Sequence, residues 1–105
     1  MITRALTRAE VETSLAGFQT EIVGLGVRRL ALFGSVQRNT ARLDSDVDVL
    51  VEFQPGEKSY DRFFALGELL ERVLGRPVDL VTTEALSPFL KPYILSEAQD
   101  VVRAA

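Results

Sequence analysis

The chain has 105 residues, a formal net charge of −3 and 47% hydrophobic residues, and it contains neither cysteine nor histidine. This composition is typical of a folded domain with one core and excludes disulfides, thiolate zinc sites and every histidine-based triad or metal ligand. The acidic balance argues against an extensive nucleic-acid surface, and no apolar run is long enough to span a membrane. Because the N-terminus also lacks a signal-peptide pattern, we expect a cytoplasmic protein with a single domain over residues 1–105.

The first half of the chain predicts one helix and two strands. Thr7 and Glu10 match a capping box at the start of the helix. An apolar stripe at helical spacing then predicts one continuous helix, with Val11, Leu15, Phe18, Ile22 and Leu25 as its members. Strands are expected over 27–33 and 46–53, with a short helix just after Ser35. The polar connection between them is short for a packed crossover, so we expect antiparallel neighbours.

The second half predicts two more helices and a third strand. An apolar stripe indicates a helix over 60–74, and a short apolar run indicates a strand over 78–82. A last helix is expected roughly over 84–98 with Pro88 near its start, whereas 101–103 fits either a terminal strand or a helix end. Core packing is the preferred interpretation of the apolar residues in this last segment, namely Phe89, Tyr93 and Leu95. The order predicts an α/β (α+β) fold with helices packed on a small mixed sheet.

Three aspartates lie in or next to the predicted strands. Asp46 and Asp48 share one face of the second strand because side chains alternate along a strand, and Asp79 lies inside the third. Same-face carboxylates ~6 Å apart repel each other by roughly 3 kcal/mol at an effective dielectric of ~20. If the third strand lies beside the second, Asp79 joins the same face. Without histidine or cysteine, such a set favours Mg²⁺, a hard cation that prefers oxygen ligands.

A glycine-serine pair at the end of the first strand supplies what a phosphate needs. Gly34 and Ser35 offer a turn with accessible backbone N–H groups and a hydroxyl donor. Arg38 and Arg42, in the following connection, are placed to reach phosphate oxygens. Because Mg²⁺ held by few carboxylates completes its shell with substrate phosphates, the pattern points to a nucleoside triphosphate.

The spacing of these residues resembles a known signature. Gly34-Ser35, ten intervening residues and then Asp46-Val47-Asp48 are similar to the motif of the polymerase-beta-type nucleotidyltransferases, and the short length resembles the minimal nucleotidyltransferase (MNT) branch. The likeness extends to Arg38 and to the third acid, Asp79. Asn39 stands where many relatives carry glycine, but asparagine also tolerates the left-handed conformation.

The resemblance implies a mechanism in which AMP moves from ATP to a hydroxyl group. Asp46 and Asp48 would bind Mg²⁺, and Asp79 would help bind a second ion or accept the proton of the attacking hydroxyl. Gly34 and Ser35 would hold the β- and γ-phosphates. The family also implies a partner, because MNT proteins act as antitoxins beside HEPN-domain toxins and modify a tyrosine of the toxin.

Other interpretations of the same residues remain open. The chain could be a non-catalytic antitoxin that neutralises a partner by forming a complex, or a subunit that modifies a small molecule. Asp79 could instead form a buried salt bridge with an arginine, the candidates being Arg28, Arg29 and Arg76. Arg38 and Arg42 could simply belong to a solvated loop.

Overall fold

The computed structural model of the chain describes residues 5–104. The helices are α1 (Arg8–Ala16), α2 (Gln19–Gly24), α3 (Gly34–Gln37), α4 (Tyr60–Leu74), the short 3₁₀ helix η1 (Thr83–Ala85) and α5 (Lys91–Glu97). The strands are β1 (Val27–Phe33), β2 (Val47–Phe53), β3 (Val78–Thr82) and β4 (Gln99–Arg103). They form one mixed sheet in the order β3-β2-β1-β4, in which β1 is antiparallel to both its neighbours and β3 is parallel to β2. The predicted fold class and the antiparallel pairing of the first two strands are confirmed.

The predicted N-terminal helix is divided into two. The capping box is present, with the Glu10 N–H donating to the Thr7 hydroxyl and the Thr7 N–H donating to the Glu10 carboxylate. Helix α1 then ends at Ala16 and α2 begins at Gln19, so the prediction of one continuous helix is wrong. The break falls at Gly17, a residue that weakens a helix. The stripe still serves the core, since Val11, Leu15 and Ile22 are fully buried, whereas Phe18 is exposed.

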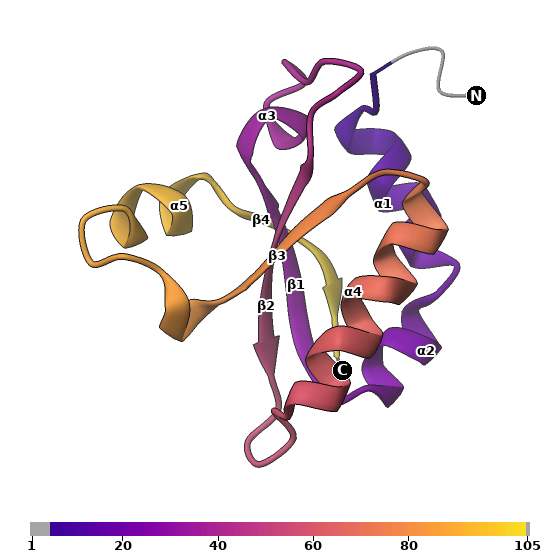
Figure 1. Ribbon diagram of the computed structural model, residues 1–105, viewed down its shortest axis with the longest axis vertical. Coiled ribbons are helices and arrows are strands. Elements are labelled where there is room, and N and C mark those ends of the chain that lie inside the picture. Colours follow the sequence, from indigo (N-terminus) through magenta and orange to yellow (C-terminus); the bar gives the residue numbers. More distant parts are fainter. Residues whose placement is uncertain (1–4, 105) are drawn as a thin grey trace.

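The helices α1, α2 and α4 lie on one side of the sheet (Figure 1). Alternate residues of the central strands point towards them, and α4 adds an apolar stripe. This helix spans the predicted residues 60–74, with Ser59 as its N-cap and the left-handed Gly75 at its end. The buried set includes Leu30, Leu32, Val47, Val49, Val51, Leu66 and Leu70. Asp48 and Glu52 alternate with these valines and therefore belong to the opposite face. Among residues 5–104, no helix is long and apolar enough to cross a membrane.

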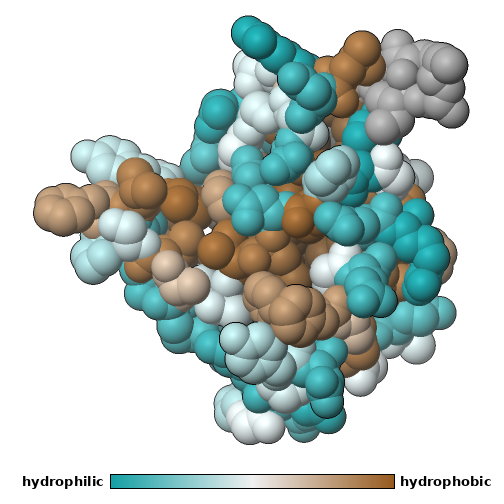
Figure 2. Space-filling view, in the orientation of Figure 1, coloured by the Kyte–Doolittle hydropathy of each residue, from teal (hydrophilic) through white to brown (hydrophobic). Residues whose placement is uncertain are grey.

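The segment between β3 and β4 differs most from its prediction. Only η1 and α5 are helical there, and Pro92, not Pro88, lies in the first turn of α5. We call residues 83–98 the α5 arm, and Figure 1 shows its helix on the side of the sheet opposite α4. No residue of α5 is buried, and Figure 2 shows apolar atoms gathered on the projecting part. The expectation of core packing is wrong, because 86% of Phe89, 74% of Tyr93 and 38% of Leu95 are exposed.

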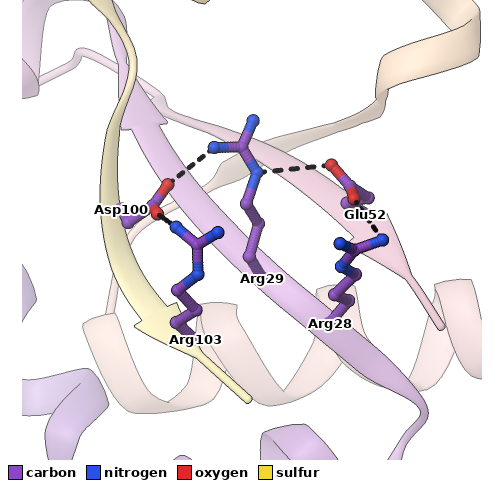
Figure 3. Close-up of polar contacts among 5 residues, drawn as sticks. All are labelled: Arg28, Arg29, Glu52, Asp100 and Arg103. Atoms are coloured by element: carbon purple, nitrogen blue, oxygen red, sulfur yellow. Dashed lines mark hydrogen bonds and ion pairs between the residues drawn. The ribbon is translucent and has the colours of Figure 1, made fainter. Parts of the chain in front are cut away.

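Strand β4 settles the interpretation of residues 101–103, which form an edge strand beside β1. A network of ion pairs joins three strands here (Figure 3). Arg29 of β1 lies at its centre, with Nη1 2.8 Å from the Asp100 carboxylate of β4 and Nε 3.3 Å from the Glu52 carboxylate of β2. Arg28 also contacts Glu52, and Arg103 also contacts Asp100. The network therefore ties both antiparallel pairings of β1 together.

The position of Arg29 predicts an unequal effect of two adjacent substitutions. We expect Arg29→Gln to lower the free energy of unfolding by about 1 kcal/mol, because it removes a half-buried cation that two carboxylates share. Arg28→Gln is the matched control and should cost less, since its more exposed side chain has one such partner here. Urea unfolding measures the free energy of unfolding of both variants. Equal losses would show that the link from Glu52 through Arg29 to Asp100 contributes nothing.

Candidate active site

The bend after β1 lies directly against a carboxylate of β2. Phe33 is the register partner of Asp48, so the next residue, Gly34, follows beside that aspartate. Gly34 has a φ of 76°, and a Cβ atom built there would lie 2.0 Å from Asp48 Oδ2. Only glycine fits this position, for both conformational and steric reasons. The antiparallel pairing that the sequence predicted therefore brings the glycine-serine bend to the start of β2.

The third aspartate is placed by the parallel pairing of β2 and β3. Asp48 and Asp79 are register partners, and the Val47 N–H donates to the Pro77 carbonyl at 2.9 Å, which fixes the start of the ladder. Asp79 is exposed, so the alternative of a buried salt bridge does not describe it. Two of its candidate partners, Arg28 and Arg29, contact Glu52 and Asp100 in the network described above.

The electrostatics of Asp48 show that the acidic side chains are close enough to act on one another. Burial is the largest cause that raises the pKa of Asp48 from 3.8 to about 6, and the negative charges of Asp79 and Asp46 contribute to the same rise. The Arg38 guanidinium opposes this rise in pKa, whereas the Glu97 carboxylate adds to it. The half-buried Asp48 is therefore the centre of a concentration of negative charge that a cation would relieve.

The donor set suits Mg²⁺ in a particular way. No group of three acidic side chains within residues 5–104 is arranged to hold a metal ion by itself. Mg²⁺ in phosphoryl-transfer sites needs only one or two protein carboxylates, because waters and substrate phosphates complete its octahedral shell. Asp48 with Asp46 or Asp79 supplies that number of carboxylates. The residues therefore fit a metal that arrives together with a triphosphate.

The turn that follows Ser35 holds Asn39 in the left-handed conformation that glycine favours. Asn39 has a φ of 58°, the only positive value among the described non-glycine residues, as the sequence predicted. Its side-chain Oδ1 accepts the N–H of Arg8 at 2.9 Å, so the turn is tied to the first residue of α1. The backbone carbonyl of Ser35 accepts the Thr40 N–H at 2.8 Å. Arg42 is exposed in the same connection, and its role towards phosphate stays a prediction.

Glu97 is a site residue that the sequence did not reveal. Its carboxylate accepts the N–H of Gly34 at 3.2 Å and also a hydrogen bond from Arg38 Nη1. The available signal was the pairing of β4 with β1, because Leu32 lies opposite Gln99 and an antiparallel ladder continued by two residues brings Gly34 opposite Glu97. That signal could not be used while residues 101–103 fitted either a strand or a helix end.

Two hollows lie near α4. One of about 460 Å³ is lined by Lys58, Ser59, Tyr60, Phe63 and Thr82, and it contains none of the predicted site residues. A second of about 350 Å³ lies between α4 and β3 and includes Asp79 in its wall. The paired acids and the glycine bend are the better guide to the reacting centre, because they carry the chemistry that a hollow alone lacks.

Comparison with known proteins assigns the chain to a class and then to a branch of it. The chain belongs to the nucleotidyltransferase domain family, whose sequence model matches residues 15–101 and so covers every predicted site residue. It is a minimal nucleotidyltransferase: a solved structure described as a candidate member of that group is 35% identical and superimposes with a TM-score of 0.69, over 84% of this chain and 93% of the other.

Other related proteins extend the comparison. The protein adenylyltransferase MntA of Thermococcus cleftensis is 40% identical over 93 residues, which are 88% of this chain and 93% of MntA. A candidate protein adenylyltransferase of Methanocaldococcus jannaschii is 46% identical over 77 residues, 73% of this chain and 82% of that protein. A complex of a tri-AMPylated Shewanella oneidensis HEPN toxin with an MNT antitoxin contains the same fold, with a TM-score of 0.61 and 18% identity over 90% of this chain and 71% of that one.

The contact of Gly34 with Asp48 predicts a steric effect that a second glycine can isolate. Gly56 has a similar φ of 78° but open space around it, so Gly56→Ala should cost about 1 kcal/mol for backbone strain alone. Gly34→Ala adds the clash with Asp48 Oδ2, and we expect it to cost at least about 2 kcal/mol more. Urea unfolding compares the two variants, and equal losses would contradict the close approach.

The raised pKa of Asp48 predicts that the carboxylate lowers stability. The pKa of Asp48 is higher in the folded chain than in the unfolded one, so its ionised carboxylate lowers the free energy of unfolding. This destabilisation is complete above pH about 6 and vanishes as the pH falls towards 3.8. We expect Asp48→Asn to raise the free energy of unfolding by about 1 kcal/mol at neutral pH, a value reduced for solvent screening of a half-buried group. The control is Asp44→Asn, an exposed aspartate. A gain from Asp48→Asn that did not shrink in acid would contradict this account.

Proposed function

We propose that the chain is a Mg²⁺- and ATP-dependent protein adenylyltransferase that transfers AMP to a tyrosine hydroxyl of a HEPN-type toxin and so acts as its antitoxin. The observation that carries the proposal is the order of groups across three neighbouring strands: Gly34 at the end of β1, Asp48 in β2 and Asp79 in β3. The similarity to protein adenylyltransferases, at 40% identity over most of the chain, supports the same activity.

The bend after β1 would bind the phosphates of ATP. The N–H of Gly34 and the hydroxyl of Ser35 would donate hydrogen bonds to the β- and γ-phosphates, and the Arg38 guanidinium would balance their charge. These groups hold the part of ATP that leaves as pyrophosphate. Their place at the β1 end of the site sets the direction in which the leaving group departs.

The acids act at the phosphorus atom that is attacked. Asp46 and Asp48 would hold Mg²⁺, which when bound neutralises the charge of the triphosphate and stabilises the transferring group. The raised pKa of Asp48 in the free chain supports this role, because a bound cation would stabilise the ionised carboxylate. Close carboxylates are a lasting cost to a protein that does not use them.

The attack comes from the side opposite the leaving group, because phosphoryl transfer proceeds in line. The tyrosine oxygen forms a bond to the α-phosphorus while the bond from that phosphorus to the bridging oxygen breaks, and pyrophosphate leaves with the bonding electrons. Asp79, on the strand farthest from the phosphate end, would accept the tyrosine proton, and its alternative role is to help bind a second ion. We place this reaction in the cytoplasm, where ATP and Mg²⁺ are abundant, and assign it to a single domain.

A second candidate function is supported by the α5 arm. Its exposed apolar side chains, Phe89, Leu90 and Tyr93, offer surface that a partner could bury. A chain that neutralised a toxin by covering it would need this surface and not the acids. The two functions separate when the acids are removed and complex formation and AMP transfer are measured side by side.

The proposed activity predicts transfer of labelled AMP from ATP to the partner toxin in the presence of Mg²⁺. We expect the double variant Asp46→Asn/Asp48→Asn to lose at least about a thousandfold in transfer rate, because the metal is then no longer held at the triphosphate. Autoradiography of the separated proteins measures the transfer, and size-exclusion chromatography measures the complex.

Two controls give the experiment its meaning. Asp44→Asn removes an acid from the same connection and should leave transfer unchanged, and replacing the acceptor tyrosine of the toxin by phenylalanine should abolish labelling. If wild type transfers no AMP and the double variant still neutralises the toxin in cells, the binding function is correct and the enzymatic one is wrong.

A further inference from the structure

The carboxylate of Glu97 lies where the proposed function requires a phosphate. It accepts the N–H of Gly34 at 3.2 Å and a hydrogen bond from Arg38 Nη1. Both donors belong to the set assigned to the triphosphate. A carboxylate and a phosphate present the same feature to such donors, namely two oxygens that share a negative charge. Glu97 therefore fills an anion site that the chain builds from its own backbone and side chain.

The two donors differ in what they can still offer. Gly34 has one N–H, and that N–H is engaged with Glu97 Oε2. Arg38 has several N–H groups and can contact a second anion, but its positive charge is partly balanced by Glu97. A triphosphate oxygen can accept the Gly34 N–H only after the carboxylate has left it. Binding of the nucleotide in this position thus requires displacement of Glu97.

The charges around the site also oppose the binding of a triphosphate. After burial and the charges of Asp79 and Asp46, Glu97 adds a smaller rise to the pKa of Asp48, so its negative charge reaches the acids of the proposed metal site. Arg38 is the cation that acts on Asp48 in the opposite sense. While Glu97 is in place, an incoming triphosphate meets one more negative charge and a partly neutralised arginine. Both effects weaken the binding of an anion.

Glu97 is attached to a part of the fold that can release it. It is the last residue of α5, a helix with no buried residue. The chain then enters β4, where Gln99 pairs with Leu32 of β1 and holds the base of the arm in the sheet. The carboxylate can leave through rotation of its side chain or movement of α5 without disturbing the buried cluster beneath the other face.

We propose that Glu97 is an intrinsic competitor for the triphosphate, a residue that lowers the affinity for ATP by occupying the phosphate-binding donors in the free chain. The proposal rests on the proposed function, since it takes Gly34 and Arg38 as phosphate ligands. It assigns to Glu97 a role in setting affinity. A purely structural ion pair would change stability and leave the affinity for ATP unaltered.

Glu97→Gln is the variant that tests the proposal, because glutamine keeps the size of the side chain and removes the charge. Isothermal titration of the full chain with Mg²⁺ and ATP should show an affinity about tenfold higher than that of wild type. Glu97→Ala, which removes the competing oxygens altogether, should show at least the same gain. Glu12→Gln is the matched control on an exposed helical position and should bind as wild type does.

Two further titrations identify the phosphates as the group that Glu97 opposes. Mg²⁺ with inorganic tripolyphosphate should show the same gain in Glu97→Gln, whereas adenosine, which has no phosphate, should show none. In the Arg38→Gln background the gain should shrink, because one of the two shared donors is then missing. A gain of equal size for adenosine would mean a general change in the site and would overturn the proposal.

The outcomes separate this inference from the function on which it rests. If wild type binds Mg²⁺ and ATP and Glu97→Gln binds them equally or more weakly, the competitor role is wrong while the nucleotide site stands. If neither chain binds them, although circular dichroism shows both to be folded, the proposed function itself is wrong and the inference goes with it.

Discussion

The pairing of β1 with β2 is the constraint on which the rest of the site depends. Its register sets Phe33 opposite Asp48 and so brings the next residue, Gly34, into contact with the Asp48 carboxylate. A register slip of one residue would point the Asp48 side chain into the apolar core and expose Val49. Burial of one face of β2 therefore fixes the register. The hydrophobic core thereby decides which groups meet on the opposite face, and the site is a consequence of packing beneath it.

The two faces of the sheet have opposite energetic roles. The face under α1, α2 and α4 buries aliphatic side chains and stabilises the fold. The other face carries Asp48 and Asp79 in register, and the raised pKa of Asp48 reports the repulsion and burial that this arrangement costs. The stability gained from the apolar face of the sheet offsets the electrostatic cost of the acids on the other face. Sites that bind a charged ligand commonly show such a trade-off.

The α5 arm joins these two parts of the molecule. Its helix packs little of itself into the fold, yet its last residue, Glu97, reaches the glycine bend and Arg38. The base of the arm is held by β4, whose own place beside β1 is reinforced by the contact of Arg29 with Asp100. Part of the site therefore depends on an edge strand from the end of the chain, far in sequence from the residues of the nucleotidyltransferase signature.

The sequence by itself determined the elements and acids that obey local rules. Alternation placed Asp48 on the face opposite the core, helical spacing determined α4, and the glycine before Ser35 indicated the bend after β1, because each of these patterns is set by neighbours along the chain. The break between α1 and α2, the exposed arm and the contact of Glu97 with Gly34 were decided only in the tertiary structure. They depend on which strands pair and which surfaces find a partner, and contacts between residues 63 positions apart leave no periodic trace in a sequence.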